Sequence, residues 1–192
     1  MRGFSLIELV VSLAVIATLG AATVLRITRG LEHWRARGAA SYVASRFAVA
    51  RMQALQHNTN VAIRFERVGS AIQIASYEDG NGDGVKSKDI ASGIDWPLAP
   101  VERIDDLFPG VTFGFEANTT LIDGTSVASG ADPIRFGSTD LVSFSPIGTA
   151  TSGTVYLHGP GGWQYAIVVL GATARTRTTQ FDPKASVWGD PW

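Results

Sequence analysis

The stretch FSLIELVVSLAVIATLGAATVL, residues 4–25, decides the fold of this chain, because its 22 residues carry a single charged side chain, Glu8. An apolar helix of about 20 residues is long enough to span the hydrocarbon core of a bilayer. The competing interpretation is a cleaved signal peptide. The apolar run of such a peptide is only about 7–15 residues long and ends at a small-residue cleavage site. We therefore expect a transmembrane helix over residues 4–25.

The helical pattern continues beyond this apolar run. Apolar residues recur at spacings of three and four, as on one face of an α-helix; they are Ile27, Leu31, Trp34, Val43, Phe47, Ala50 and Ala54. The spacing predicts that residues 26–57 are an amphipathic continuation of the same helix, with a stop at Asn58. Such a helix would be roughly 80 Å long at about 1.5 Å per residue, so only its first half could lie in lipid.

Charge is distributed unevenly along the 192 residues, although the formal net charge is only −1. Residues 1–57 hold seven arginines and two glutamates, whereas residues 58–192 hold nine basic and fifteen acidic side chains. The chain has no cysteine, which excludes disulfides and thiolate metal sites. The near-neutral total gives no general preference for anionic partners.

Residues 3–10, GFSLIELV, carry a specific combination: Gly3, then Phe4, then Glu8 five residues after the glycine, inside an apolar run. This resembles the class III signal of type IV prepilins and pseudopilins. The resemblance implies that a prepilin peptidase cleaves between Gly3 and Phe4 and methylates the new amino group of Phe4. Residues 1–3 would then be the leader. It is short for the family, so either the true start lies upstream or a minimal leader suffices.

The position of Glu8 fits an assembly role. A charged side chain inside a bilayer costs about 2.5–3.5 kcal/mol on the insertion scale, so such residues are usually paired. After cleavage, the amino group of Phe4 would be a cation near the same depth, in the same subunit or in a neighbour. The alternative is a carboxylate that is solvated at the headgroup level.

The orientation in the membrane follows from the resemblance and not from the flanking charges. The positive-inside rule alone would place the flank with Arg26, Arg29, Arg35 and Arg37 in the cytoplasm. Cleavage after Gly3 requires a cytoplasmic amino terminus instead. We therefore expect a single-pass protein of the bacterial inner membrane with its C-terminal domain in the periplasm.

Residues 58–192 have the pattern of a β-rich globular domain. Val61, Ile63 and Phe65 alternate with other residues, and a second alternation at 72–76 follows a turn at Gly69, so a hairpin is expected. Further strands are predicted at 111–115, 141–144, 155–157 and 165–170, with a turn at 159–162 and a long loop at 116–133. The predicted fold class is α+β, a long N-terminal helix packed on an antiparallel sheet.

Residues in the C-terminal half indicate which prepilin-like proteins this chain resembles. Residues 143–155, SFSPIGTATSGTV, resemble the domain shared by GspH pseudopilins and FimT minor pilins, and residues 166–169 and 174–177 resemble its end. The resemblance implies a pilin-like fold and a minor pseudopilin of the type II secretion pseudopilus, a structural subunit whose partners are other pilins.

The alternative is a FimT-like minor pilin of type IV pili. In some FimT proteins the arginines at the positions of Arg175 and Arg177 bind DNA. On a strand both would point to the same face and could contact phosphates. Otherwise they are solvated arginines at the edge of an acidic domain.

A separate motif is DGNGDGV at residues 79–85. Asp79, Asn81 and Asp83 occupy positions one, three and five of a calcium loop, and Gly84 follows at position six. A complete loop would have a glutamate at position twelve, where this chain has Ile90, with Asp89 one residue earlier. The motif therefore predicts either a calcium site that uses Asp79, Asn81, Asp83 and Asp89, or a plain Asp/Asn/Gly loop.

The sequence gives no indication of catalysis. His33, His57 and His158 match no metal-binding spacing, and no nucleophile elbow or phosphate loop is present. We expect a protein that is not an enzyme and has no cofactor apart from the calcium considered above.

Overall fold

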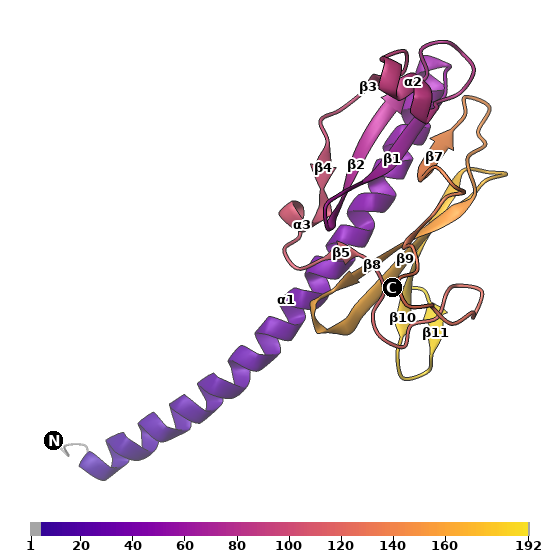
Figure 1. The fold of residues 1–192 in the computed structure, drawn as a ribbon. Helices are drawn as coiled ribbons and strands as arrows, with labels where there is room; N and C mark the ends of the chain where they lie inside the picture. The colour runs from indigo at the N-terminus through magenta and orange to yellow at the C-terminus, as the bar shows by residue number, and fades with distance from the viewer. Residues whose placement is uncertain (1–4, 192) are drawn as a thin grey trace.

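The structure is a computed structural model that describes residues 5–191, and for residues 20–29 it describes the backbone only. Its main feature is the helix α1, Leu6–His57, which projects far beyond the globular domain at its N-terminal end (Figure 1). The helix has 52 residues, so it is roughly 78 Å long at about 1.5 Å per residue. It ends as predicted at Asn58, whose left-handed φ of 54° lets its N–H donate to the carbonyl of Ala54.

The second half of α1 is covered by two antiparallel sheets. Its buried residues recur at spacings of three and four, and most are alanines, which allow strands to approach the helix closely; they are Ala36, Ala39, Ala40, Val43, Phe47, Ala50 and Ala54. Of the residues predicted on the apolar face, Val43, Phe47, Ala50 and Ala54 are buried, whereas Leu31 and Trp34 are exposed. The predicted α+β fold with a helix packed on antiparallel β-structure is confirmed, and the strands are arranged in two sheets.

The first sheet contains the predicted hairpin. β1, Val61–Val68, pairs with β2, Ala71–Glu78, through a turn at Gly69, whose φ is 63°. β7, Leu141–Phe144, lies on the other side of β1. Two-residue strands, β3 at Trp96–Pro97 and β4 at Glu102–Arg103, pair with β2. Two short helices, α2 at Ser87–Ser92 and α3 at Ile104–Leu107, lie in the same region of the chain.

The second sheet has the order β11-β10-β9-β8-β5, and β6 also pairs with β8. Its strands are β5 Thr112–Phe113, β6 Ile134–Arg135, β8 Gly153–Gly159, β9 Trp163–Leu170, β10 Arg175–Asp182 and β11 Val187–Gly189. A short 3-10 helix, η1 at Pro160–Gly162, forms the predicted turn between β8 and β9.

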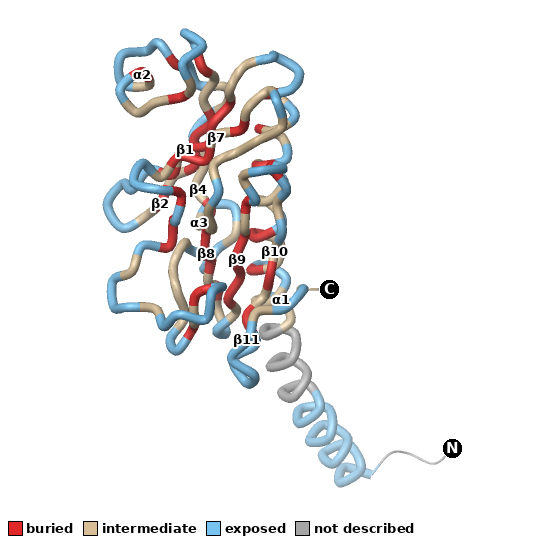
Figure 2. The backbone as a smooth tube through the Cα atoms, turned by 90° about the vertical axis from the view of Figure 1, so that its right-hand side faces the viewer, coloured by how far each residue is buried: buried red, intermediate tan, exposed pale blue. Residues whose placement is uncertain are grey.

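The central strand β9 is mainly buried, as its continuous apolar run predicts (Figure 2). Its Tyr165 and Ile167 belong to the main core with α1, while Ala166 belongs to a second cluster with Leu121 and Tyr156. Trp188 of β11 packs against this second cluster, and its indole N–H donates to the carbonyl of Thr120 at 3.0 Å. The long loop at 116–133 and the C-terminal hairpin therefore cover the second sheet on the side away from α1.

Candidate functional site

The N-terminal end of α1 carries the residues expected to direct processing and assembly. Gly3 and Phe4 lie outside the described residues. Ser5 precedes the helix with an extended backbone, and Glu8 is exposed in the first turn. The positive end of the helix dipole favours a carboxylate at this place. The Ser12 hydroxyl donates to the backbone carbonyl oxygen of Glu8 at 2.7 Å.

The side chains around Glu8 form an apolar surface that the domain does not cover. It extends over consecutive residues on all sides of the helix; the large exposed side chains are Leu6, Ile7, Leu9, Val10, Val11, Leu13, Val15, Ile16 and Leu19. A helix that is apolar all round normally lies in a protein interior or in a membrane. This surface therefore needs a covering that the single chain does not supply.

Within the part of the chain that the structure describes, no helix is both long and apolar enough to cross a membrane. The transmembrane helix predicted at 4–25 lies partly outside that description, which omits residues 1–4 and the side chains of residues 20–29.

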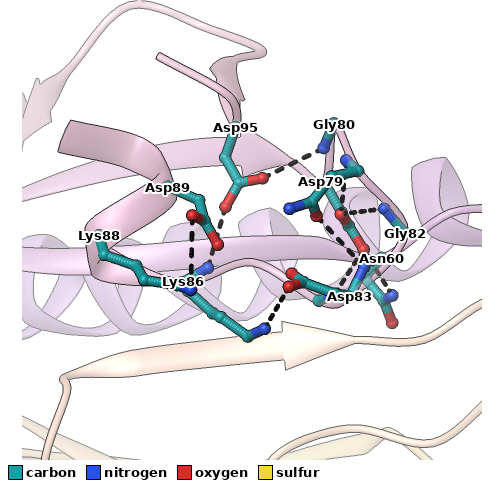
Figure 3. A network of polar contacts seen from close by, with 11 residues as sticks. Asn60, Asp79, Gly80, Gly82, Asp83, Lys86, Lys88, Asp89 and Asp95 are labelled. Carbon is teal, nitrogen blue, oxygen red and sulfur yellow. Dashed lines mark hydrogen bonds and ion pairs between the residues drawn. The ribbon is translucent and has the colours of Figure 1, made fainter. Parts of the chain in front are cut away.

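The predicted calcium loop lies at the opposite end of α1, directly after β2 (Figures 1 and 3). Asp79 is only 4% exposed, and its carboxylate organises the loop. Its Oδ1 accepts the N–H groups of Asn81 at 3.1 Å and Gly82 at 2.8 Å. Its Oδ2 accepts the N–H of Gly84 at 2.7 Å and the side-chain amide of Asn60 at 3.0 Å. Burial alone would raise the pKa of Asp79, but these hydrogen bonds lower it below its usual value.

The backbone of the loop takes the left-handed conformation that the motif requires. Gly82 has a φ of 79° and Gly84 a φ of 89°, which side chains other than glycine rarely adopt. The Asn81 side chain accepts the N–H of Asp83 at 3.2 Å. Asp79, Asn81 and Asp83 are therefore in one tight turn, as predicted.

Lys86 joins this turn to Asp95, while Asp89 of α2 lies 4.0 Å from the ammonium of Lys88. The Lys86 ammonium lies 2.6 Å from the Asp83 carboxylate, and its backbone N–H donates to Asp95 at 2.9 Å. Asp95 also accepts the N–H of Gly80 at 3.1 Å (Figure 3). The sequence motif did not indicate Asp95, because this residue lies beyond a helix that the pattern did not predict.

Among residues 5–191, no three His, Cys, Asp or Glu side chains stand together in an arrangement that could hold a metal ion. The four predicted ligands therefore lie in one neighbourhood without forming a preassembled carboxylate cage.

Replacement of Asp79 by alanine is expected to lower the free energy of unfolding by about 2–4 kcal/mol, because it leaves four N–H donors without their acceptor. Chemical denaturation of the purified chain in detergent, followed by tryptophan fluorescence, would measure the change. Since the native pKa is lowered, the stabilisation is present above the unfolded pKa of about 3.9 and is lost as the pH falls through the native pKa. The difference between the two proteins should therefore shrink below about pH 4.

The matched control is Asp123→Ala, in an exposed turn where the carboxylate accepts the N–H of Thr125 at 2.9 Å. Its effect should stay below about 1 kcal/mol. Equal effects of the two substitutions would show that Asp79 does not organise its loop.

Arg175 and Arg177 lie on β10 with exposed side chains on the same face, as the alternation predicts. Arg177 has an acidic neighbour, because its Nε lies 4.0 Å from the Asp190 carboxylate. DNA binding by the two arginines stays a prediction.

Comparison with known proteins identifies the N-terminal signal. Residues 1–24 match the family described as the prokaryotic N-terminal methylation motif. This match confirms the predicted resemblance to prepilin-like proteins. The comparison with curated proteins found no match.

Two solved structures of the minor pseudopilin EpsH from the type II secretion system of Vibrio cholerae are similar to this chain. The first is 12% identical, with a TM-score of 0.46, and the alignment covers 75% of this chain and 95% of EpsH. The second is 11% identical, with a TM-score of 0.45, and covers 75% of this chain and 92% of EpsH.

Proposed function

We propose that this chain is a structural, pilin-like subunit that α1 anchors in the bacterial inner membrane and that assembles with other pilins through this helix. One observation carries the proposal: a prokaryotic N-terminal methylation motif occupies residues 1–24, where α1 begins. A motif of this kind is processed at the membrane, so the helix that follows it is delivered to lipid.

The contrast between the two halves of α1 supports this proposal. From Ala36 onward the helix is held by the domain, whereas Leu6 and Ile7 are 84% and 70% exposed. Exposed apolar surfaces of this extent mark sites of membrane or protein contact. Lipid would cover this surface before assembly, and the helices of neighbouring subunits would cover it in a filament.

We infer further that the machine is a type II secretion system, in which the chain would be a minor pseudopilin with its domain in the periplasm. The resemblance of residues 143–155 to the GspH and FimT domain supports this assignment. The same resemblance leaves a FimT-like minor pilin of type IV pili as the alternative. The exposed Arg175 and Arg177 favour that alternative, and the Asp190 carboxylate beside Arg177 weighs against a DNA contact there.

Processing at the Gly3–Phe4 bond is the direct test. In cells with an active prepilin peptidase, mass spectrometry of the purified chain should find a mature protein that begins at N-methylated Phe4. Cells without the peptidase provide the control and should yield the uncleaved chain. A mature protein that still begins at Met1, or one cut near Ala22, would contradict the proposal.

A further inference from the structure

Two turns form the end of the domain from which α1 projects (Figure 1). One is η1, which lies against the helix, since a Cβ at Gly161 would come within 2.7 Å of the Glu32 carboxylate. The other joins β10 to β11. A surface hollow of about 410 Å³ lies between the two turns, and its lining includes Trp163 and Lys184. This end of the domain therefore faces the direction in which the apolar part of α1 extends.

Aromatic side chains gather where α1 meets this end of the domain. The ring centroid of His33 lies 4.2 Å from that of Trp163 and 6.2 Å from that of Trp34. Trp34 is 65% exposed, and the Arg37 guanidinium carbon lies over its ring, 5.5 Å from the centroid. Tryptophan is enriched at membrane–water interfaces, where one part of the ring meets apolar groups and another part meets polar groups. An exposed tryptophan beside an arginine has the composition of such an interface.

This part of α1 is also positively charged. Residues 26–37 hold four arginines and one glutamate, whereas residues 58–192 hold nine basic and fifteen acidic side chains. Arg35 is exposed and Arg37 is partly exposed. In the turn between β10 and β11, the charges of Lys184 and Asp182 cancel. The positive charge of the chain is therefore concentrated on the segment of α1 between the apolar run and the domain.

With residues 4–25 in lipid, as the proposed function requires, these side chains lie next to the lipid surface. The headgroup layer beyond the hydrocarbon core is roughly 5–8 Å thick. Trp34, Arg35 and Arg37 follow Leu25 by about 14–18 Å along the helix axis, at about 1.5 Å per residue. Long side chains on a helix point back toward its N-terminus, which here is the membrane side. The gap that remains is within the Debye length of about 8 Å at physiological salt, so the arginines interact with charges of the surface.

We propose that Trp34, Arg35 and Arg37, which we name the basic collar, bind the headgroups of anionic phospholipids and hold the end of the domain against the membrane. This contact rests on the membrane anchorage proposed above. The positive-inside rule disfavours arginines on the side of the membrane that carries the domain. Attraction to anionic lipids compensates this cost, because each basic side chain near a negatively charged surface is stabilised there. Entry of α1 into a filament, where neighbouring helices replace lipid, would break the contact.

The test uses the full chain in lipid nanodiscs that contain a phosphatidylcholine with a nitroxide on its headgroup, which quenches the fluorescence of nearby tryptophans. At low salt, nanodiscs with about 30% phosphatidylglycerol should quench about twofold more of the tryptophan fluorescence than nanodiscs of phosphatidylcholine alone. In about 0.5 M sodium chloride the two values should become equal, because salt screens the attraction. Equal quenching in the two kinds of nanodisc at low salt would overturn the proposal.

Substitutions assign the contact to the collar. Arg35→Gln together with Arg37→Gln should abolish the increase that phosphatidylglycerol causes, and the exposed Arg35→Gln alone should lose about half of it. The matched control is Arg175→Gln together with Arg177→Gln, which removes the same charge from the end of β10 away from the hollow and should keep the full increase. An undiminished increase in the collar variants, or an equal loss in the control, would refute the collar.

A further variant identifies the tryptophan that reports the contact. Trp34→Phe should lose at least half of the quenching, because Trp34 is the exposed aromatic residue of the collar. Trp96→Phe is the control, since Trp96 pairs with β2 in the first sheet, and it should keep the quenching. Quenching that Trp34→Phe leaves unchanged would place Trp34 away from the headgroups and would contradict the proposal.

Failure of the membrane anchorage would be seen separately. The anchored chain should co-migrate in size-exclusion chromatography with nanodiscs of either lipid composition. Co-migration with both, combined with quenching that does not depend on phosphatidylglycerol, would overturn the collar alone and leave the proposed function intact. A chain that co-migrates with neither kind of nanodisc would overturn both the anchorage and the collar.

Discussion

Replacement of Phe47 by alanine is expected to lower the free energy of unfolding of the domain by about 3–5 kcal/mol, the range for large buried aromatic residues. Phe47 is 0% exposed and lies where α1 meets strands of the domain. Its ring centroid is 6.2 Å from that of Phe65, 5.9 Å from that of Phe136 and 6.1 Å from that of Phe144. Truncation would leave a cavity surrounded by rings that cannot close it.

Domains are usually stable by only about 5–15 kcal/mol, so this single change could bring the folded state near its limit. Urea denaturation followed by circular dichroism would measure the loss. The matched control is Met52→Ala on the same helix, where the side chain is 50% exposed and alanine is a good helix former. Its effect should stay within about 0.5 kcal/mol. A loss below about 1 kcal/mol for Phe47→Ala would mean that the domain does not depend on this aromatic cluster.

The helix and the first hairpin could be predicted from the sequence because their signals are local. The spacing of apolar residues from Ile27 to Ala54 repeats over many turns, and Asn58 tolerates the left-handed backbone that ends the helix. Between Val61 and Ser76 the alternation of apolar residues is long enough to define two strands, and Gly69 provides the turn. Such patterns do not depend on distant parts of the chain.

The short elements could not be predicted in the same way. β3, β4 and β6 have two residues each, too few for any periodicity, and they exist only because β2 or β8 offers free backbone groups. The helix α2 has six residues and no side-chain cap. For this reason the carboxylate of Asp95, which follows α2 in the chain, could not be placed beside the loop.

The packing of the C-terminal hairpin on the domain also could not be predicted from a local sequence pattern. Trp188 covers Tyr156, which is 32 residues earlier in the chain, with ring centroids 5.8 Å apart. An aromatic residue in a sequence rich in proline and glycine is compatible with a segment that binds a partner and equally with a segment that packs on its own domain. Only the fold of β10 and β11 together decides that it belongs to the domain.

Replacement of Glu8 by alanine is expected to give a subunit that is made, inserted and folded but is incorporated into filaments about tenfold less or worse. Removal of a charge from the apolar end of α1 makes the helix more apolar and should not harm insertion. The domain contacts the helix from about His33, whose ring centroid lies 4.2 Å from that of Trp163. This contact is about 40 Å from Glu8 at about 1.5 Å per residue, so the stability of the domain should not change. The loss should arise from the Phe4 amino group, which we expect to be a cation near the depth of Glu8.

The size of this effect follows from the cost of an unpaired charge in lipid, which is about 2.5–3.5 kcal/mol. Half of this cost already corresponds to a factor of about ten in an equilibrium constant. The assay is crosslinking to partner pilins in membranes, measured beside secretion or piliation of the same cells. The control is Glu32→Ala, the other carboxylate on α1, which lies beyond the apolar run and should leave crosslinking unchanged. Loss of function with normal crosslinking would assign Glu8 another role. Normal function together with normal crosslinking would mean that the carboxylate is solvated at the membrane surface, so that no charge pair guides the packing of neighbouring helices.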